Sequence, residues 1–441
     1  MIVLVDEGAM STTSTPTQED WVLICQPRGA SQSVAEVRLV QLRRNAKLAL
    51  GQSKLSLGPL VGVPFGTNFL VEHSCRSGGL ALVRDDRSVE ELLGETGNTR
   101  ERLEGASSTG GGAGSIEIDD GSAQRLDVQQ IKRLKAESAS GDSVVIAIAQ
   151  GSRTFASKSS FAQVKYLRKK ARKHMQFVSA LRPTALALSD MYAAKAPEKL
   201  LCLRRDSLAL LLSLGGLQPG ARALVLEGSL GLLTAAASQR VGSEGRVLAL
   251  HLHRPNLEAL RWLNLSAPCI SNIAACPLAH FLCCVNDSGA GTDGEPRVAA
   301  GLDSHVGRGG GDASSCGGVQ MKPRALSDAD ARSWTAHGFT SLVIATREPP
   351  LPVLLTMLEL LRPSCPFVLY HPSSQPLADC MHACQQARIA VRMQLIEPWT
   401  RSYQVEQNRT HPTMSTYCPT GYVLAGVRVE TDVVTSRAST E

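Results

Sequence analysis

The stretch LVLEGSLGLLTAAASQRVGSEGRVLALH, from Leu224 to His251, carries the pattern that decides the fold. An apolar run over 223–226 ends at an acid and glycines, and a helical segment of small residues follows. The turn GSEG then leads into a second apolar run. Strand, glycine-containing loop, helix and strand in this order make a βαβ unit of a parallel sheet, whose first loop usually meets a dinucleotide or S-adenosylmethionine.

The same alternation of strands and helices continues after this unit. Apolar runs over 341–345 and 366–370, with helical segments between them, predict further strands, and late strands are expected at 390–396 and 421–428. This alternation is typical of a doubly wound parallel sheet. We therefore expect a Rossmann-like, methyltransferase-type α/β domain over residues 199–430.

The first loop departs from what a methyltransferase of this architecture needs. An E/D-x-G-x-G-x-G loop has glycines where Ser229 and Leu233 stand, because glycines let backbone amides approach a cofactor closely. His251 stands where an acid would hold the ribose hydroxyls, and LVIATREPP lacks the Asp-x-Pro element that would face a target base. These losses predict a domain that lacks a competent cofactor loop, in which Glu227 caps a helix or accepts loop hydrogen bonds. A retained weak cofactor pocket is the alternative.

Residues 19–125 have a different pattern of apolar runs and turns. Short apolar runs in WVLICQPRGASQSVAEVRLVQLRRNAKLALGQSKLSLGPLVGVPFGTNFLVE alternate with Gly, Pro and Asn turns about every eight to twelve residues, which favours a small antiparallel β-barrel. Low-complexity insertions are expected at 87–121 in this domain and at 286–327 in the α/β domain, and disordered tails at 1–18 and 431–441. Segments so rich in Gly, Ser and Asp bury too little apolar surface to offset the entropy of ordering.

Residues 126–198 are expected to form a basic helical segment between the two domains. DVQQIKRLKAESASGDSVVIAIAQ and FAQVKYLRKKARKHMQFVSAL predict helices, and apolar residues of the second recur at steps of three and four. No acidic residue lies between Asp142 and Asp190, which favours a polyanionic partner such as nucleic acid over a merely solvated face. The candidate RNA-binding residues here are Lys165, Arg168, Lys169, Lys170, Arg172 and Lys173.

Composition excludes several classes of protein. With 441 residues, 43% of them hydrophobic, the chain can bury cores for two or three domains. The longest apolar run, LALLLSLGGL, is shorter than the about 20 residues of a membrane helix, and the N-terminus lacks a signal-peptide pattern. We therefore expect no membrane partner. The twelve cysteines suggest thiols in a reducing compartment, cytosol or nucleus.

Two groups of cysteine and histidine could hold a metal ion. The first is Cys269, Cys276, Cys283 and Cys284 with His280 nearby, and the second is CMHAC, which contains Cys380, His382 and Cys384. Neither group has the CxxC pairs of structural zinc sites. We therefore expect buried thiols in the first group, the wall of a helix in the second, and no metal.

Several pieces of the chain carry a family resemblance. FAQVKYLRKKARKH, KAPEKLLCLRRDSLALLLSLGGLQPGARALVLEGSLGLL and LIEPWTRSYQVEQNRTHP resemble the non-catalytic subunit of the eukaryotic nuclear tRNA (adenine-N1-)-methyltransferase. RRNAKLALGQSKLSLGPLVGVPFGTNFLV is similar to the barrel domain of that family. The resemblance covers most of the chain outside the low-complexity segments. It departs at TMSTYCPTG, where a glycine-rich turn is expected, and at a basic run that Leu167, Ala171 and His174 dilute.

The resemblance implies a non-catalytic, tRNA-binding chain in the nucleus with no cofactor of its own. It implies a catalytic paralogous subunit that holds S-adenosylmethionine, a heterotetramer of two copies of each chain, and formation of m1A58 in the tRNA T-loop. The residues alone indicate only a basic, cofactor-poor Rossmann-like protein. An active methyltransferase with a degenerate loop and an RNA-binding scaffold without a catalytic partner are the alternatives.

The segment RSYQVEQNRTHP is expected to lie at the subunit junction beside the partner's active site, as the connection of a terminal β-hairpin. Arg401 and Arg409 can bind phosphate, Tyr403 can stack on a base, and His411 can donate a hydrogen bond. In the alternative interpretation, Tyr403 and Val405 belong to the core and the arginines cover the sheet edge. For His411, a catalytic acid–base role is a further alternative.

Overall fold

The computed structural model of the 441-residue chain describes residues 15–26, 36–50, 53–73, 80–85, 125–137, 141–158, 163, 166–167, 169–170, 177–252, 256–286, 323–401, 403–404, 410–412 and 421–430. The predicted insertion over 87–121 and the tail over 431–441 lie outside these residues, as do most of the tail over 1–18 and most of the insertion over 286–327. No helix within the described ranges is long and apolar enough to cross a membrane.

The N-terminal part of the chain forms a seven-stranded sheet in the order β2-β1-β7-β5-β6-β4-β3. Neighbouring strands run antiparallel, except for a short parallel pairing of β4 with β6. A buried cluster that includes Val22, Leu55 and Val178 fills one side of the sheet. Its elements are β1 (Trp21–Gln26), β2 (Glu36–Gln41), β3 (Lys47–Leu50), β4 (Ser53–Ser56), the short helix η1 (Gly58–Leu60), β5 (Asn68–His73), β6 (Leu80–Asp85) and β7 (Phe177–Leu181).

Strand β7 corrects the sequence interpretation, which placed Phe177–Leu181 at the end of a basic helix. The segment instead lies between β1 and β5, where it pairs antiparallel with both strands. Phe177, Val178 and Ala180 are buried there. An alternating or short apolar run can fit either a helix or a strand, and pairing with two distant strands decides the outcome.

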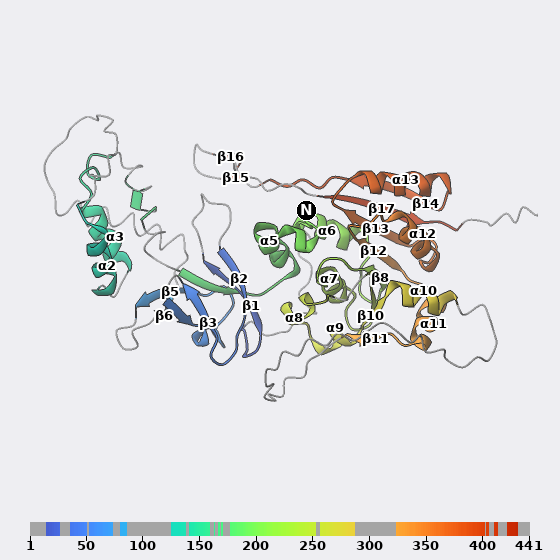
Figure 1. Cartoon of the computed structure of the whole chain (residues 1–441), viewed down its shortest axis with the longest axis horizontal. Helices are drawn as coiled ribbons and strands as arrows, with labels where there is room; N and C mark the ends of the chain where they lie inside the picture. Colours follow the sequence, from blue (N-terminus) through green and yellow to red (C-terminus); the bar gives the residue numbers. More distant parts are fainter. Residues whose placement is uncertain are drawn as a thin grey trace, which may run out of the picture.

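The first predicted helical stretch, residues 127–150, contains two helices, α2 (Val128–Glu137) and α3 (Gly141–Gln150). Of the following basic helix, the structure describes Gln163, Tyr166, Leu167, Lys169 and Lys170, all in helical conformation. The side chain of Leu167 is buried with Val145, Phe155 and Phe177, as its place on the apolar face predicts. This small cluster attaches the helices to the N-terminal sheet, at the left of Figure 1.

The C-terminal part contains the predicted Rossmann-like sheet, with strand order β11-β10-β9-β8-β12-β13-β17-β14. All pairings from β11 to β13 are parallel, and β17 runs antiparallel to both of its neighbours. Strands β10 and β11 were not anticipated. The strands are β8 (Arg222–Leu226), β9 (Arg246–His251), β10 (Ile273–Pro277), β11 (Arg324–Ala325), β12 (Ser341–Ala345), β13 (Pro366–His371), β14 (Ala390–Ile396) and β17 (Tyr422–Arg428).

Helices cover both faces of this sheet, as Figure 1 shows. Alternate residues of β8 divide between two cores: Ala223 and Val225 face one, Leu224 and Leu226 the other. The first face carries α5 (Ala185–Lys195), α6 (Arg205–Leu214), α7 (Leu232–Val241), α8 (Ala259–Trp262) and α9 (Ala267–Ser271), with the short helix η2 (Pro197–Leu200) between α5 and α6. The second carries α10 (Leu278–Asn286), α11 (Asp328–His337), α12 (Leu351–Leu360) and α13 (Gln375–Gln386).

The two sheets are joined directly by packing and hydrogen bonds. The Asn264 side chain accepts a hydrogen bond from the Trp21 amide at 2.9 Å and donates to the Trp21 carbonyl at 2.8 Å. Leu23 of β1 is buried in the core on the α5–α9 face, and Lys195 of α5 donates to the Val37 carbonyl of β2. These contacts hold the N-terminal sheet against α5 and α8.

Candidate functional site

The loop after β8 is closed by its own acid. One carboxylate oxygen of Glu227 accepts hydrogen bonds from the Ser229 amide and hydroxyl, both at 2.6 Å. The other accepts from the Thr234 amide at 2.9 Å and the Thr234 hydroxyl at 2.7 Å. Because Thr234 lies in the first turn of α7, the carboxylate caps the helix end that would otherwise face a bound anion. Of the two predicted roles of Glu227, the acceptor of loop hydrogen bonds is confirmed, whereas the N-cap residue of α7 is Gly231.

Two further contacts hold the loop after β9 against this turn. The Leu230 carbonyl accepts a hydrogen bond from the Ala259 amide at 3.0 Å. A Cβ on Gly231, which has a φ of 81°, would lie 2.7 Å from the Leu257 Cα. Leu230 itself has a φ of 58°, in the left-handed region that costs a residue with a side chain about 1 kcal/mol. Leu257 therefore lies directly against the part of the loop that a cofactor would approach.

A cavity of about 310 Å³ remains at the carboxyl ends of β8, β9 and β12. Its lining includes Glu227, Leu257 and the buried residues His251 and Thr346, which the sequence placed at the positions of a missing ribose acid and a missing base-facing element. The Thr346 hydroxyl accepts a hydrogen bond from the Glu348 amide at 3.0 Å. The structure thus brings the substituted positions together at the switch point of the sheet, where such folds bind ligands.

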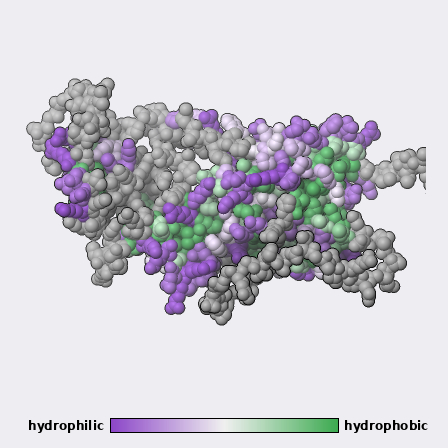
Figure 2. Space-filling model, viewed as in Figure 1, coloured by the Kyte–Doolittle hydropathy of each residue, from purple (hydrophilic) through white to green (hydrophobic). Residues whose placement is uncertain are grey.

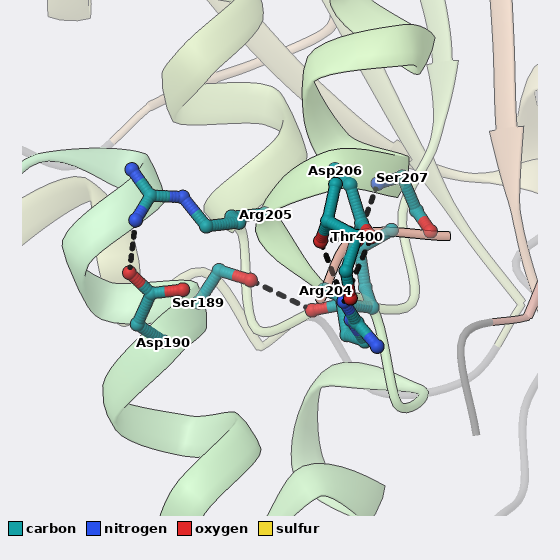
Figure 3. Close-up of polar contacts among 8 residues, drawn as sticks. Ser189, Asp190, Arg204, Arg205, Asp206, Ser207 and Thr400 are labelled. Carbon is teal, nitrogen blue, oxygen red and sulfur yellow. Dashed lines mark hydrogen bonds and ion pairs between the residues drawn. The ribbon is translucent and has the colours of Figure 1, made fainter. Parts of the chain in front are cut away.

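A second site is built on the segment that leaves β14. Figure 3 shows Arg204, at the start of α6, reaching both Asp206 and Thr400. The guanidinium lies 2.9 Å from the Asp206 carboxylate and donates to the Thr400 hydroxyl at 2.7 Å, and that hydroxyl donates to Asp206 at 2.9 Å. The Arg204 and Asp206 side chains are only 12% and 7% exposed. This triad, which joins two largely buried side chains to the exposed Thr400, fixes the chain one residue before Arg401.

Beyond this anchor the chain forms a small ribbon of β15 (Tyr403–Gln404) and β16 (His411–Pro412), which pair antiparallel. Since β14 and β17 also pair antiparallel, the ribbon is the connection of a terminal hairpin, as predicted. Arg401 and His411 are exposed, and Tyr403 is 58% exposed, so Tyr403 is not a core residue. Arg409 and Val405 lie outside the described residues. Figure 1 shows the ribbon extending from the C-terminal sheet toward the side of the N-terminal sheet.

The basic helix is described only in part. Lys169 is exposed, and the Lys170 ammonium lies 5.2 Å from the centre of the Tyr166 ring. Both belong to the predicted RNA-binding set. Lys165, Arg168, Arg172 and Lys173 lie outside the residues that the structure describes, so their role stays a prediction.

Sequence reasoning missed a groove of about 640 Å³ between the N-terminal sheet and the helices α5 and α8. Its aromatic lining consists of Trp21, Tyr192 and Trp262, and the last two rings stack with their centres 5.7 Å apart. Burial, with a smaller effect of Glu258, raises the pKa of Tyr192, so the phenol stays protonated at neutral pH. No local signal could have revealed this groove, because one wall comes from the N-terminal sheet, with Trp21, Arg38 and Leu39, and the other from residues 191–262.

The groove is strongly cationic. Glu258 is the one acid in its lining, against four basic residues, Arg38, Lys195, Lys199 and Arg261. Lys199 and Arg261 are exposed, and neither forms an ion pair with another described residue. Stacked aromatic rings beside cations make a surface suited to the bases and phosphates of nucleic acid.

The first cysteine group does not form one site. Cys269 is buried in the core on the α5–α9 face, whereas Cys276 and Cys284 lie in the core on the opposite face of the sheet. In the second group, Cys380 and Cys384 are buried on α13, as a helix wall requires. Burial raises the pKa of Cys380 to about 12, so this thiol stays protonated at neutral pH.

A model of the Gcd10p family matches residues 17–287. The chain is 27% identical to a mouse (Mus musculus) protein named tRNA (adenine(58)-N(1))-methyltransferase non-catalytic subunit TRM6, over 90% of this chain and 86% of that protein. It is 26% identical to the subunit of the same name from Dictyostelium discoideum, over 95% of this chain and 81% of that protein.

Among solved structures, a SAM-dependent O-methyltransferase from Thermotoga maritima aligns with a TM-score of 0.48 at 12% identity, covering 95% of this chain and 96% of that chain. The family model covers more than half of the sequence, from β1 of the N-terminal sheet to the end of α10. The chain therefore belongs to the Gcd10p family.

Proposed function

We propose that this chain is the non-catalytic, tRNA-binding subunit of the complex that forms m1A58 in the tRNA T-loop. The relatives are named as non-catalytic subunits of this methyltransferase. The observation that favours the role in this chain is the loop after β8, whose hydrogen-bonding groups are taken up by the Glu227 carboxylate. A subunit whose first loop is closed needs a second chain to supply the methyl donor. That chain would be a paralogous subunit with an intact glycine loop.

The loop does not fit S-adenosylmethionine in this chain. The Glu227 carboxylate accepts four hydrogen bonds from its own loop and helix, and Leu257 lies against Gly231. A cofactor would have to displace these contacts and find a ribose partner at His251, which is not an acid. The cofactor therefore belongs to the partner subunit.

Three surfaces support binding of tRNA: the basic helix, the ribbon β15–β16 and the groove beside α5 and α8. Folded RNA is recognised through phosphates, shape and stacking of unpaired bases. The groove combines four cations with aromatic rings, and the ribbon presents the exposed side chains of Arg401, Tyr403 and His411. In this proposal the chain binds tRNA while the partner subunit methylates adenine 58.

The edge strand β14 supports contact with the partner subunit. Val391 and Leu395 on this strand are 46% and 37% exposed, and Trp399 beyond it is 65% exposed. Figure 2 shows apolar residues gathered at the end of the molecule where β14 and α12 lie. Exposed apolar side chains on an open sheet edge are a typical protein interface. The proposed assembly is a heterotetramer with two copies of this chain and two of the catalytic subunit. Its proposed location is the nucleus.

The deciding experiment expresses the chain with and without its candidate catalytic paralogue. We expect methyl transfer to tRNA only from the co-purified complex, and no heat of S-adenosylmethionine binding in calorimetry on the isolated chain. One-to-one binding near micromolar affinity would instead support an active methyltransferase with a degenerate loop. Purification without any methyltransferase partner would support an RNA-binding scaffold.

A further inference from the structure

Three metal-ligating side chains converge where α10 and α11 meet. His280 and Cys284 lie four residues apart, on one face of α10, and Asp328 is the first residue of α11. The Cys284 sulfur lies 3.6 Å from His280 Nε2 and 3.3 Å from Asp328 Oδ1. His280 Nε2 lies 3.5 Å from the same Asp328 oxygen. One nitrogen, one sulfur and one oxygen therefore form a nearly equilateral triangle.

The size of this triangle matches one face of a tetrahedral zinc site. Zinc binds sulfur at about 2.3 Å and nitrogen or oxygen at about 2.0–2.2 Å, so ligand atoms at the tetrahedral angle are about 3.4–3.6 Å apart. All three measured separations lie within a few tenths of an ångström of these values. Little movement is needed for the three atoms to share one ion.

The surroundings also suit a metal ion. The sulfur belongs to a buried cysteine, whereas the His280 and Asp328 side chains are 54% and 62% exposed, which leaves a path of entry from solvent. Among the described residues this is the one group of three or more such side chains whose ligand atoms converge.

We propose that His280, Cys284 and Asp328 bind Zn²⁺, with water in the fourth position. A mixed nitrogen, sulfur and oxygen set favours zinc over magnesium or calcium, which prefer oxygen ligands alone. Binding replaces the thiol proton of Cys284, which leaves to solvent, with a sulfur–zinc bond. The ion links the last turn of α10 to the first residue of α11.

The test is metal analysis of the full chain in its co-purified complex, with affinity tags removed so that no tag binds the ion. After equilibration with Zn²⁺ and gel filtration, we expect about one zinc per chain in the wild type. The exposed residue substitutions His280→Gln and Asp328→Asn should lower zinc retention at least tenfold without loss of folding. Cys283→Ser, a neighbouring exposed cysteine on the same helix, is the matched control and should retain zinc.

Cobalt supplies a second readout that does not depend on activity. Co²⁺ in the wild type should show a thiolate charge-transfer band in the near ultraviolet and strong visible bands of a tetrahedral ion, and Cys284→Ser should lose the charge-transfer band. Zinc should raise the unfolding temperature of the wild type but not of His280→Gln. Equal zinc retention in wild type and His280→Gln, or a cobalt spectrum without the thiolate band, would overturn the proposal. In that case the three side chains form only a hydrogen-bonded cluster.

Discussion

At the scale of single residues, Glu227 shows how the loop after β8 is held by hydrogen bonds within the chain. The acid keeps the position it has in a cofactor loop, but its carboxylate binds the Ser229 and Thr234 groups of its own chain. Ser229, which stands where the loop pattern has a glycine, is completely buried, and Thr234 lies in α7, so both hydroxyls are partners of the carboxylate. The Ser229 hydroxyl, which a glycine would lack, therefore stabilises the closed loop.

Replacing Glu227 with Gln should lower the free energy of unfolding by about 1–3 kcal/mol. Each carboxylate oxygen now accepts two hydrogen bonds, and the NH₂ group that replaces one of these oxygens cannot accept any. The free energy of unfolding, from urea denaturation of the isolated chain, measures this effect. Glu244→Gln in the exposed turn before β9 is the control, with an expected change within about 0.5 kcal/mol. Equal effects of the two substitutions would show that the hydrogen bonds of Glu227 contribute nothing.

At the scale of elements, the basic segment is divided by tertiary pairing. Its first part packs Leu167 beside α3, and its last part becomes β7 in the middle of the N-terminal sheet. The described residues at both ends of this segment therefore contact the N-terminal sheet. Of its predicted RNA-binding residues the structure describes Lys169, which is exposed, and Lys170, which lies over the Tyr166 ring.

If this basic segment binds phosphates, substituting Lys165, Arg168, Lys169, Arg172 and Lys173 together with Gln should weaken tRNA binding by the assembled complex. The slope of log affinity against log salt should fall by about 0.7–0.9 for each phosphate that is no longer neutralised, because fewer counterions are released. Folding should survive, since Leu167 and the rest of the apolar face are unchanged. An unaltered slope would mean that these charges are only solvated.

The ribbon β15–β16 makes a separate prediction. Arg401→Ala with Arg409→Ala should leave the complex assembled but lower its methylation rate at limiting tRNA about tenfold or more, because hydrogen bonds to charged groups contribute about 1.5–3 kcal/mol. The anchor at Thr400 is untouched, which protects folding. Arg388→Ala, at an exposed site after α13, is the control. Loss of the assembled complex would indicate that the two arginines have a packing role. A methylation rate equal to that of the wild type would exclude both the packing role and the tRNA-contact role.

At the scale of the whole molecule, the contact between the two domains creates the cationic groove. Asn264 binds both backbone groups of Trp21, and this contact places the N-terminal sheet against the helices that follow β7 and β9. Neither domain alone contains the groove, since Arg38 comes from one and Lys199 and Arg261 from the other. The mutual orientation of the two domains therefore determines the shape of the groove, which we propose as an RNA-binding surface.

Substituting Lys199 and Arg261 with Gln should lower the salt slope of tRNA binding by the complex by about 1.4–1.8, the value expected when two phosphates are no longer neutralised. Arg332→Gln with Arg388→Gln removes the same charge from the opposite face of the sheet and should change the slope little. If the first pair instead abolishes assembly in gel filtration, the groove is a docking site for the partner subunit. Equal slopes for both pairs would exclude the groove as an RNA-binding surface.

The sequence by itself determined the features that depend on neighbouring residues. The βαβ unit from Leu224 to His251, the altered loop at Ser229 and Leu233, and the hairpin around RSYQVEQNRTHP are all local patterns of hydrophobic period and residue type. Only the tertiary structure decided that Phe177–Leu181 is a strand, that Trp21 meets Trp262 across a groove, and that Asp328 lies beside Cys284. These outcomes depend on the free energy of packing between segments that are distant in sequence. The hydrophobic periodicity of a single segment does not determine that free energy.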